Sequence, residues 1–201
     1  PNMLLNEKLR PYRLLLASQS PRRRELLTGS GLPYTLAPKY PCEERYPDTL
    51  PAEDVPLFLS RLKSEAYPEP LAANDILLTA DTVVVAAGRV LGKPCDREDA
   101  VSMLRTLSGC SHTVVTGVTF RSETQIHTFG ARSEVRFRRL TDEEIDYYID
   151  TYRPYDKAGS YGVQEWIGYV AIEHIDGSFY NVMGLPIQKV YTELEKFIDR
   201  L

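Results

Sequence analysis

The spacing of apolar residues along the first half of the chain predicts alternating strands and helices. Short, β-prone apolar runs predict strands at Arg13–Ala17 and Asp75–Ala80, with a weaker one at Leu36–Tyr40. Between the first two lies Pro41–Pro51, which is rich in Pro, Glu and Asp and is typical of a surface loop. Apolar residues at helical spacing predict helices over residues 21–27, 55–67 and 96–107.

The second half of the chain is dominated by alternating patterns. Residues Thr113–Phe120 and Ile126–Phe137 predict two long antiparallel strands. Further on, strands at Gly168–Ile175 and Phe179–Met183 are expected to form a hairpin around the turn Asp176-Gly177. Together with the first half, this order predicts an α/β fold built on a mixed sheet. Two more helices are expected, one opened by a capping box of Thr141 and Glu144 and a last one beginning at Pro186.

A second hairpin is predicted around an acidic residue. The strand Asp75–Ala80 runs into Asp81, the chain continues and turns at Ala87-Gly88, and residues 90–94 return. A carboxylate directly after a buried strand is costly without a partner such as a metal ion or a cation. In a tight hairpin Lys93 would lie near Asp81. The alternatives are that Asp81 caps a turn and that Lys93 is a surface lysine.

Polar chemistry is most concentrated where the first strand meets the first helix. Ser20 is a good N-cap and Pro21 suits the first helical position, so Arg22 and Arg23 fall in the first turn. Cations there oppose the helix macrodipole by about 0.3–1 kcal/mol each, so helix stability does not explain them. Free N–H groups, the hydroxyls of Ser18 and Ser20 and several guanidinium groups indicate a phosphate site. The alternative is a solvated basic patch.

Composition limits the classes of protein that this chain can be. Its 201 residues suit one domain, or two lobes that share one core, so we expect residues 1–201 to form a single domain. A net charge of −4 argues against a general nucleic-acid binder. No apolar run approaches the roughly 20 residues of a membrane span, and no secretory signal is visible. We expect Pro1 and Asn2, which precede Met3, to be remnants of an expression vector.

The three cysteines, Cys42, Cys95 and Cys110, are odd in number and lack metal-ligand spacing. They are typical of free thiols in a reducing compartment, which predicts a cytoplasmic protein. The chain also lacks a cluster of His and Cys residues, which argues against zinc. Any divalent ion would therefore be held by oxygen ligands, as Mg²⁺ and Mn²⁺ are.

Five motifs follow one another along the chain: residues 18–27 (Ser-Gln-Ser-Pro-Arg-Arg-Arg-Glu-Leu-Leu), Ala80-Asp81-Thr82, Gly92-Lys93-Pro94, residues 157–164 (Lys-Ala-Gly-Ser-Tyr-Gly-Val-Gln) and Gly184-Leu185-Pro186. In this order they resemble the Maf family of nucleotide pyrophosphatases, and the resemblance runs from about Arg13 to the C-terminus. The helix segment Leu59–Ser64 also resembles a family motif whose lysine, here Lys63, reaches the triphosphate.

The resemblance implies a fold, a reaction and a set of residues. The implied fold is an elongated, twisted mixed sheet flanked by helices in two lobes with a central cleft, in a homodimer. The implied reaction is attack at the α-phosphate of a nucleoside triphosphate, with Asp81 as the catalytic carboxylate. Asp81 and Glu43 would bind Mg²⁺ or Mn²⁺, although the acidic residue expected before Glu43 is Cys42 here. Implied substrate-binding residues are Ser18, Arg22, Arg23, Lys63, Thr82, Lys93, Lys157 and Gln164.

Three positions bear on the choice of substrate. In the family, the subgroup that acts on dTTP and UTP carries Arg, Thr and Gln where this chain has Arg22, Thr82 and Gln164. An amide such as that of Gln164 offers a donor and an acceptor, which suits the imide edge of uracil or thymine. A subgroup acting on 7-methylguanosine triphosphate remains as an alternative. The resemblance thus implies a pyrimidine triphosphate pyrophosphatase that also accepts modified pyrimidines and removes unwanted nucleotides.

Two other classes of function are open to this sequence. A non-catalytic nucleotide-binding regulator of cell division would bind nucleotide without turnover, and the presence of Asp81, Glu43 and two lysines argues against it. An RNA-binding module could use the arginines around Arg136, but the chain lacks a stacking-aromatic motif and is acidic overall.

Overall fold

The computed structural model describes residues 3–201, so Pro1 and Asn2, the expected vector remnants, lie outside the described residues. Within residues 3–201, seven strands form one sheet in the order β2-β1-β3-β5-β6-β7, with β4 paired to β3. Strand β1 is parallel to β2 and β3, whereas the β3–β4 and β6–β7 pairs are antiparallel. The predicted α/β fold with a mixed sheet is confirmed. The strands are β1 Arg13–Leu16, β2 Thr35–Leu36, β3 Asp75–Ala86, β4 Arg89–Leu91, β5 Ser111–Arg121, β6 Ile126–Phe137 and β7 Ile172–Asp176.

Helices flank this sheet, and most of them begin where the sequence pattern predicts. Ser20 and Asp96 cap the helices that follow them, and Thr141 with Glu144 forms the predicted capping box. Two short 3₁₀ turns, Ala52–Asp54 and Ala158–Ser160, precede α3 and follow α5. The helices are α1 Leu5–Lys8, α2 Pro21–Gly29, α3 Val55–Glu65, α4 Arg97–Leu107, α5 Asp142–Tyr152, α6 Trp166–Ala171, α7 Phe179–Met183 and α8 Ile187–Asp199.

The chain divides into two compact units. Unit 1 consists of the residues up to Asp81, Thr116–Ala131 and Gly184–Leu201, and unit 2 consists of Thr82–Val115 and Arg132–Met183. The cleft between two lobes and the single domain over residues 1–201 therefore stay predictions.

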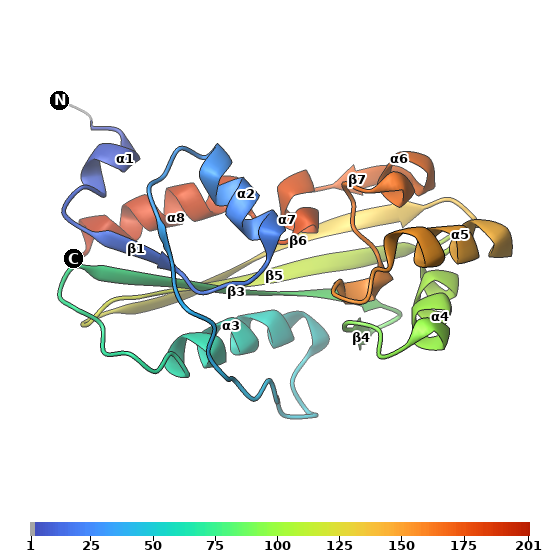
Figure 1. The fold of residues 1–201 in the computed structure, drawn as a ribbon, viewed down its shortest axis with the longest axis horizontal. Coiled ribbons are helices and arrows are strands. Elements are labelled where there is room, and N and C mark those ends of the chain that lie inside the picture. The colour runs from blue at the N-terminus through green and yellow to red at the C-terminus, as the bar shows by residue number, and fades with distance from the viewer. Residues whose placement is uncertain (1–2) are drawn as a thin grey trace. The chain divides into compact units, whose positions relative to one another are not determined.

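Unit 1 is a part of the sheet covered on both faces. Helix α3 lies on one face and helices α2 and α8 lie on the other (Figure 1). The inner side of α3 is partly polar, because Ser60 and Ser64 are fully buried. Ser60 Oγ lies 2.9 Å from Thr119 Oγ1, and Arg121 donates to the Ser64 hydroxyl and carbonyl at 3.0 and 2.8 Å. These bonds fix α3, and with it Lys63, on strand β5.

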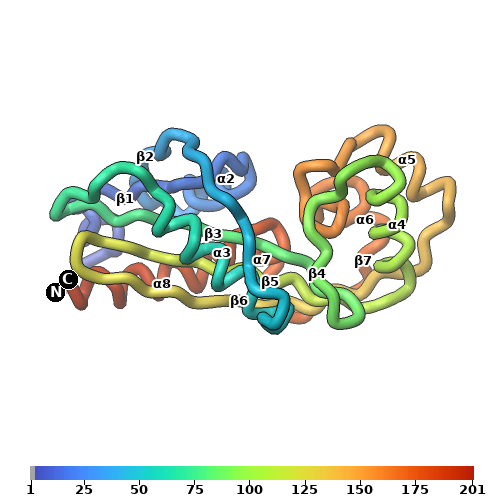
Figure 2. The backbone as a smooth tube through the Cα atoms, turned by 90° about the horizontal axis from the view of Figure 1, so that it is seen from below, coloured from blue at the N-terminus to red at the C-terminus, as the bar shows by residue number. Residues whose placement is uncertain are grey.

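Unit 2 contains the helix pair α4 and α5, which lie side by side (Figure 2). Arg97 at the start of α4 donates to Asp150 at 2.9 Å and to Asp146 at 3.1 Å, both on α5. Buried aromatic rings pack nearby: His112 and Tyr161 meet edge to face at a centroid distance of 5.4 Å. Burial without a charged partner lowers the pKa of His112 to about 4, so this histidine is a neutral core residue.

The predicted hairpin near the C-terminus is wrong. Residues 168–171 belong to helix α6, and Phe179–Met183 forms helix α7 instead of a strand. Strand β7 pairs with β6 instead, with Val135 opposite Ile175. The α7 turn places the fully buried Asn181, whose amide donates to Val114 O at 3.2 Å and to Ser133 Oγ at 3.0 Å. These tertiary bonds override the local β-propensity.

Two smaller predictions also need correction. The weak strand at Leu36–Tyr40 is limited to Thr35–Leu36, and Pro38 could not have donated to its ladder. Strand β3 does not end at Asp81 but continues unbroken to Ala86, so Asp81 lies within the strand. Helix α1 was not predicted.

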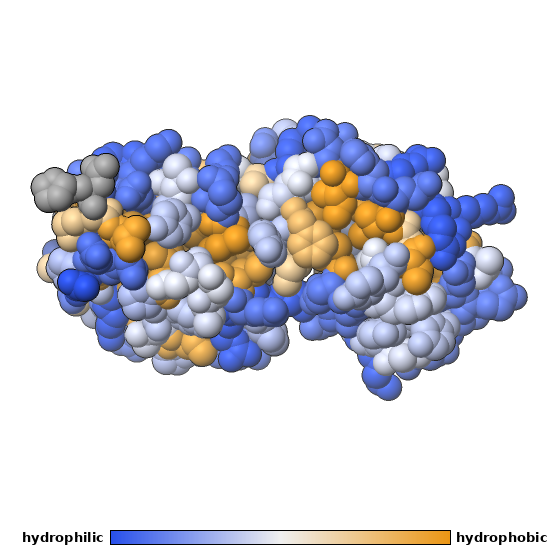
Figure 3. Space-filling model, turned by 90° about the horizontal axis from the view of Figure 1, so that it is seen from above, coloured by the Kyte–Doolittle hydropathy of each residue, from blue (hydrophilic) through white to orange (hydrophobic). Residues whose placement is uncertain are grey.

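Apolar side chains also reach the surface. Figure 3 shows apolar patches among hydrophilic residues on the face seen from above. In unit 2, Tyr169 is 84% exposed and Tyr180 is 50% exposed. Among residues 3–201, none of the helices has the combination of length and apolar character that crossing a membrane would require.

The capping box of α5 predicts a change of stability in acid. Glu144 accepts two hydrogen bonds from Arg138, at 3.0 and 2.6 Å, and a third from the Thr141 N–H. These bonds lower the pKa of Glu144 to about 2. A lowered folded-state pKa stabilises the fold above the unfolded value near 4.5, and this contribution disappears as the pH falls toward 2. Because both side chains are partly exposed, we expect a loss of about 1–2 kcal/mol over this range.

The measurement is urea unfolding of wild type and Glu144→Gln at several values between about pH 5 and pH 2. Gln keeps the capping geometry but does not titrate, so this part of the acid dependence should be absent in the variant. Equal acid dependence in both proteins would contradict the prediction.

Candidate functional site

The turn before α2 is built as its sequence predicts. Ser20 caps the helix, with its hydroxyl accepting from the Arg23 N–H at 3.4 Å, and Pro21 occupies the first helical position. The Arg23 side chain then turns back, because its Nε donates to the Gly184 carbonyl at 2.8 Å and its Nη1 to Ser18 Oγ at 3.4 Å. Ser18 and Arg23 are thereby held together within unit 1.

Lys63 joins two carboxylates in the same unit. Its Nζ donates to Asp81 Oδ1 at 2.9 Å and to the Ala80 carbonyl at 3.2 Å, and it lies 2.9 Å from Glu44 Oε1. The side chains of Lys63 and Asp81 are 21% and 13% exposed, which shields this ion pair from solvent. Tyr40 adds a hydrogen bond to the Lys63 carbonyl at 2.6 Å.

Arg23 interacts electrostatically with two carboxylates of this cluster, and Arg22 interacts with Arg23. Burial lowers the pKa of Arg23, the charges of Asp81 and Glu44 oppose that shift, and the charge of Arg22 adds to it. Unit 1 therefore brings together five of the predicted site residues, Ser18, Arg22, Arg23, Lys63 and Asp81. Cations and carboxylates at such short range suit a phosphate ligand accompanied by a cation.

Glu44, which the sequence interpretation missed, contacts Lys63, whereas the metal-binding role of Glu43 stays a prediction. The Glu43 side chain is 72% exposed and pairs with Arg45 at 2.8 Å, while Glu44 contacts Lys63. Burial raises the pKa of Cys42, with the nearby charge of Glu44 as the next cause. A signal was present in the sequence: Glu43-Glu44 is an acidic pair shifted by one residue, whereas Cys42-Glu43 lacks the expected first acid.

The other predicted residues, Thr82, Lys93, Lys157 and Gln164, belong to unit 2. Thr82 follows Asp81 directly in β3, and the predicted tight hairpin is confirmed, with Val84 opposite Leu91. Extending that register by two residues would set Lys93 opposite Thr82, but the pairing ends at Leu91 and Lys93 is exposed.

The loop that carries Lys157 and Gln164 is tied to this hairpin. The Gly159 N–H donates to the Gly92 carbonyl at 3.1 Å, and Gly159, with φ at +70°, leaves no room for a Cβ, which would stand 2.7 Å from Val84 Cγ2. Only glycine combines this backbone conformation with so close an approach. The loop therefore lies against β3 next to Lys93.

A buried tyrosine anchors the other end of the same loop. The Tyr148 hydroxyl donates to Glu165 Oε1 at 2.6 Å and accepts from the Gly162 N–H at 3.0 Å. Glu165 Oε1 lies 3.9 Å from Nζ of Lys157, whose side chain is 11% exposed. Between these anchors, the buried Gln164 Oε1 has no hydrogen-bond partner among residues 3–201. An unsatisfied buried acceptor is costly, so this oxygen is available to a donor from water or from a ligand.

The chemistry of the carboxylates in unit 1 fits a divalent ion. Asp81 Oδ2 is buried and lacks a hydrogen-bond partner within the part of the chain that the structure describes. In that same part, no group of three or more His, Cys, Asp or Glu side chains could hold a metal ion by itself. Mg²⁺ is usually bound by one or two carboxylates together with substrate phosphates, so two carboxylates are sufficient.

With this fold and this arrangement of residues, the comparison with known proteins defines the class. The Maf-like protein family matches residues 13–197, and the chain belongs to that family. A dTTP/UTP pyrophosphatase of Porphyromonas gingivalis is 53% identical over 193 residues, which cover 95% of this chain and 97% of the relative. One from Bacteroides fragilis is 52% identical, covering 92% and 96%. The Staphylococcus aureus Ham1 protein aligns with 92% of this chain and 98% of its own, at 15% identity and a TM-score of 0.48.

Proposed function

We propose that this chain hydrolyses dTTP and UTP to the nucleoside monophosphate and pyrophosphate. The observation that carries the proposal is the shielded cluster of Lys63, Asp81 and Glu44 with Arg23 beside it. Relatives about half identical over nearly the whole chain carry the name of this activity. Removal of unwanted or modified pyrimidine nucleotides would be its purpose in the cell.

In this proposal Asp81 is the catalytic carboxylate. Hydrolysis of a phosphoanhydride needs positioning, charge stabilisation and an activated water. The cations Arg23 and Lys63 would stabilise the charge that builds up on the departing pyrophosphate. Mg²⁺ or Mn²⁺ held by Asp81 and Glu44 would lower the pKa of the attacking water and neutralise phosphoryl oxygens.

In this proposal the base is recognised mainly by Gln164 of unit 2. Gln164 presents an acceptor that lacks a partner among the described residues, and its amide can both donate and accept. The imide edge of thymine or uracil offers the complementary N–H and carbonyl groups. We propose that Gln164 pairs with this edge, with Thr82 and Arg22 as the other two residues of the pyrimidine pattern.

The test is a product assay on a panel of dTTP, UTP, CTP, dATP, GTP and 7-methylguanosine triphosphate, each with Mg²⁺ or Mn²⁺. Pyrophosphate and orthophosphate are scored separately. Pyrophosphate from dTTP and UTP is the expected result. Turnover of 7-methylguanosine triphosphate alone would contradict the base assignment, and nucleotide binding without any turnover would favour the regulator.

The neighbouring glutamates provide a matched pair of variants. Glu44→Gln should raise the Mg²⁺ concentration needed for half-maximal rate by about tenfold, because a ligand carboxylate becomes a neutral amide. Glu43→Gln should behave like wild type, since Glu43 faces solvent and pairs with Arg45. The measurement is the initial rate against Mg²⁺ concentration at saturating dTTP. The reverse pattern would return the metal-ligand role to Glu43.

We further propose that the protein acts as a homodimer in the cytoplasm. Its free cysteines, Cys42, Cys95 and Cys110, are in keeping with a reducing compartment. Sedimentation at several protein concentrations tests the dimer.

A further inference from the structure

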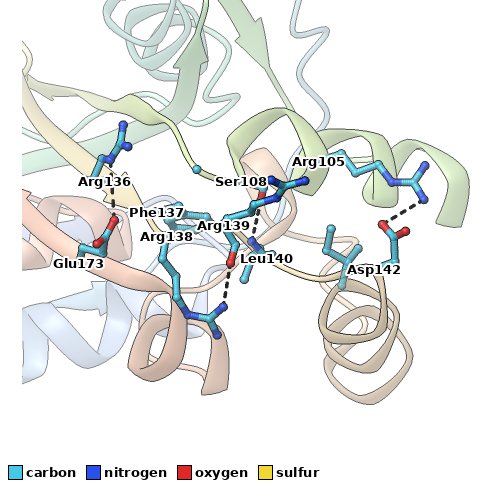
Figure 4. A pocket seen from close by; sticks show the side chains of 11 residues that line it. Arg105, Ser108, Arg136, Phe137, Arg138, Arg139, Leu140, Asp142 and Glu173 are labelled. Atoms are coloured by element: carbon cyan, nitrogen blue, oxygen red, sulfur yellow. Dashed lines mark hydrogen bonds and ion pairs between the residues drawn. The ribbon is translucent and has the colours of Figure 1, made fainter.

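Unit 2 contains a hollow that none of the candidate site residues lines. It has a volume of about 660 Å³ and lies where the end of α4, the end of β6 and the start of α5 meet, with one residue of β7 at its edge. A volume of this size suits a small ligand. Figure 4 shows Arg136 on β6 and Arg105 on α4, with Arg138 and Arg139 on the segment that follows β6.

The charge of this hollow opposes the charge of the chain. Arg105, Arg136, Arg138 and Arg139 line it together with the carboxylates of Asp142 and Glu173, and Arg138 also pairs with Glu144, so these four cations and three anions leave a local charge of +1. The chain as a whole carries −4. A concave basic surface on an acidic protein concentrates small anions.

The arginines differ in how firmly they are held. Arg138 is fully engaged, because it donates to Glu144 and also to the Val170 and Arg139 carbonyls. Arg105 lies 3.5 Å from Asp142, and Arg136 lies 3.8 Å from Glu173 (Figure 4). Both of these pairs are about half exposed or more, so they are weak and exchangeable.

Arg139 is the third available arginine. Its side chain is exposed, and its guanidinium has no hydrogen bond or ion pair within residues 3–201. Arg105, Arg136 and Arg139 together offer guanidinium forks from different sides of one hollow. Such forks match the several oxygens of a phosphate group better than a single carboxylate.

The floor of the hollow provides no slot for a nucleobase. Phe137, Leu140 and Ile145 are 0%, 7% and 2% exposed, so the floor is closed. The Phe137 ring already packs edge to face against His112, at a centroid distance of 5.1 Å. Recognition here therefore depends on the charge of the ligand and not on stacking.

We propose that this hollow is a binding site for a compact polyphosphate, such as free pyrophosphate or the di- or triphosphate group of a nucleotide. The three available guanidinium groups would replace their weak carboxylate partners with phosphoryl oxygens. A long polyanion is disfavoured by the acidic surface of the rest of the chain. This binding does not depend on the proposed catalytic activity.

The test follows the backbone amides of Gly109 and Leu140, which line the hollow, by NMR without divalent metal. The protein is titrated separately with pyrophosphate, dTTP, dTMP and orthophosphate. Shifts of these amides with pyrophosphate and dTTP, and weaker ones with dTMP and orthophosphate, are expected. A response to pyrophosphate alone would identify the free ion as the ligand, while equal responses to dTMP and dTTP would overturn the polyphosphate assignment.

Three charge-reversal variants complete the experiment. Arg139→Glu and Arg105→Glu should each weaken pyrophosphate binding at these amides by about tenfold or more. Arg132→Glu is the matched control, since Arg132 is an exposed arginine of β6 that does not line the hollow. This variant should bind pyrophosphate with the affinity of wild type. The proposal is overturned if neither amide shifts at pyrophosphate concentrations that saturate the shifts of all other responding amides. It is also overturned if Arg139→Glu and Arg132→Glu bind pyrophosphate with equal affinity.

Discussion

Replacing Asp81 with Asn should lower kcat for dTTP by about a thousandfold while the fold is preserved. The amide has the shape of the carboxylate and can still accept from Lys63, which keeps its contacts with Glu44 and the Ala80 carbonyl. What is lost is the charge that would take a proton from water or hold the ion.

The measurement combines steady-state kinetics on dTTP with equilibrium binding of dTTP to the variant. Asp48→Asn serves as the control, because Asp48 is an exposed carboxylate of the same unit outside the cluster. A kcat for Asp81→Asn within about tenfold of wild type would exclude Asp81 as the catalytic carboxylate. If the variant loses both dTTP binding and turnover, Asp81 instead has a role in holding the substrate.

Replacing Gly117 with Ala should destabilise the protein by about 3 kcal/mol or more. A Cβ at this position of β5 would stand 2.2 Å from the Pro56 carbonyl oxygen and 2.5 Å from the Leu57 nitrogen. These are backbone atoms of the first turn of α3, so the clash cannot be relieved by rotating a side chain. Helix α3 must move, and Lys63 moves with it.

Urea unfolding measures the stability, and the rate on dTTP of the folded fraction measures the displacement of Lys63. Gly29→Ala is the matched control in the same unit, since no atom lies within 4 Å of a Cβ there and Gly29 ends a helix. It should be neutral or stabilising by up to about 1 kcal/mol. If the free energy of unfolding of Gly117→Ala lies within about 1 kcal/mol of the wild-type value, α3 is free to shift on the sheet.

The sequence alone was sufficient wherever short-range chemistry decides the structure. The Ser20 cap with Pro21 after it, the capping box of Thr141 and Glu144 and the tight turn at Ala87-Gly88 each depend on a few neighbouring residues. The contacts that specify these features lie within the same stretch of chain. For the same reason the polar turn of Ser18 and Arg23 is recognisable from the sequence.

Sequence patterns predicted the interior of the sheet less well. Asp81 was placed at the end of a strand because a carboxylate interrupts an apolar run, yet β3 continues unbroken to Ala86. The carboxylate is tolerated inside the strand because Lys63, 18 residues earlier in the chain, donates to it. A partner so distant in sequence leaves no periodic signal.

Tertiary contacts alone decided two further features. Residues 179–183 have a strand-like composition but form a helical turn, because the buried Asn181 amide must reach Val114 and Ser133. Glu44, and not the adjacent Glu43, contacts Lys63, and the sequence could not show this because a loop without regular structure has no periodicity to fix which of two adjacent carboxylates faces inward. The sequence by itself therefore determined the class of fold, most helix starts and the chemical character of the site. Only the tertiary structure decided which side chains meet, since buried polar groups find partners in space and not along the chain.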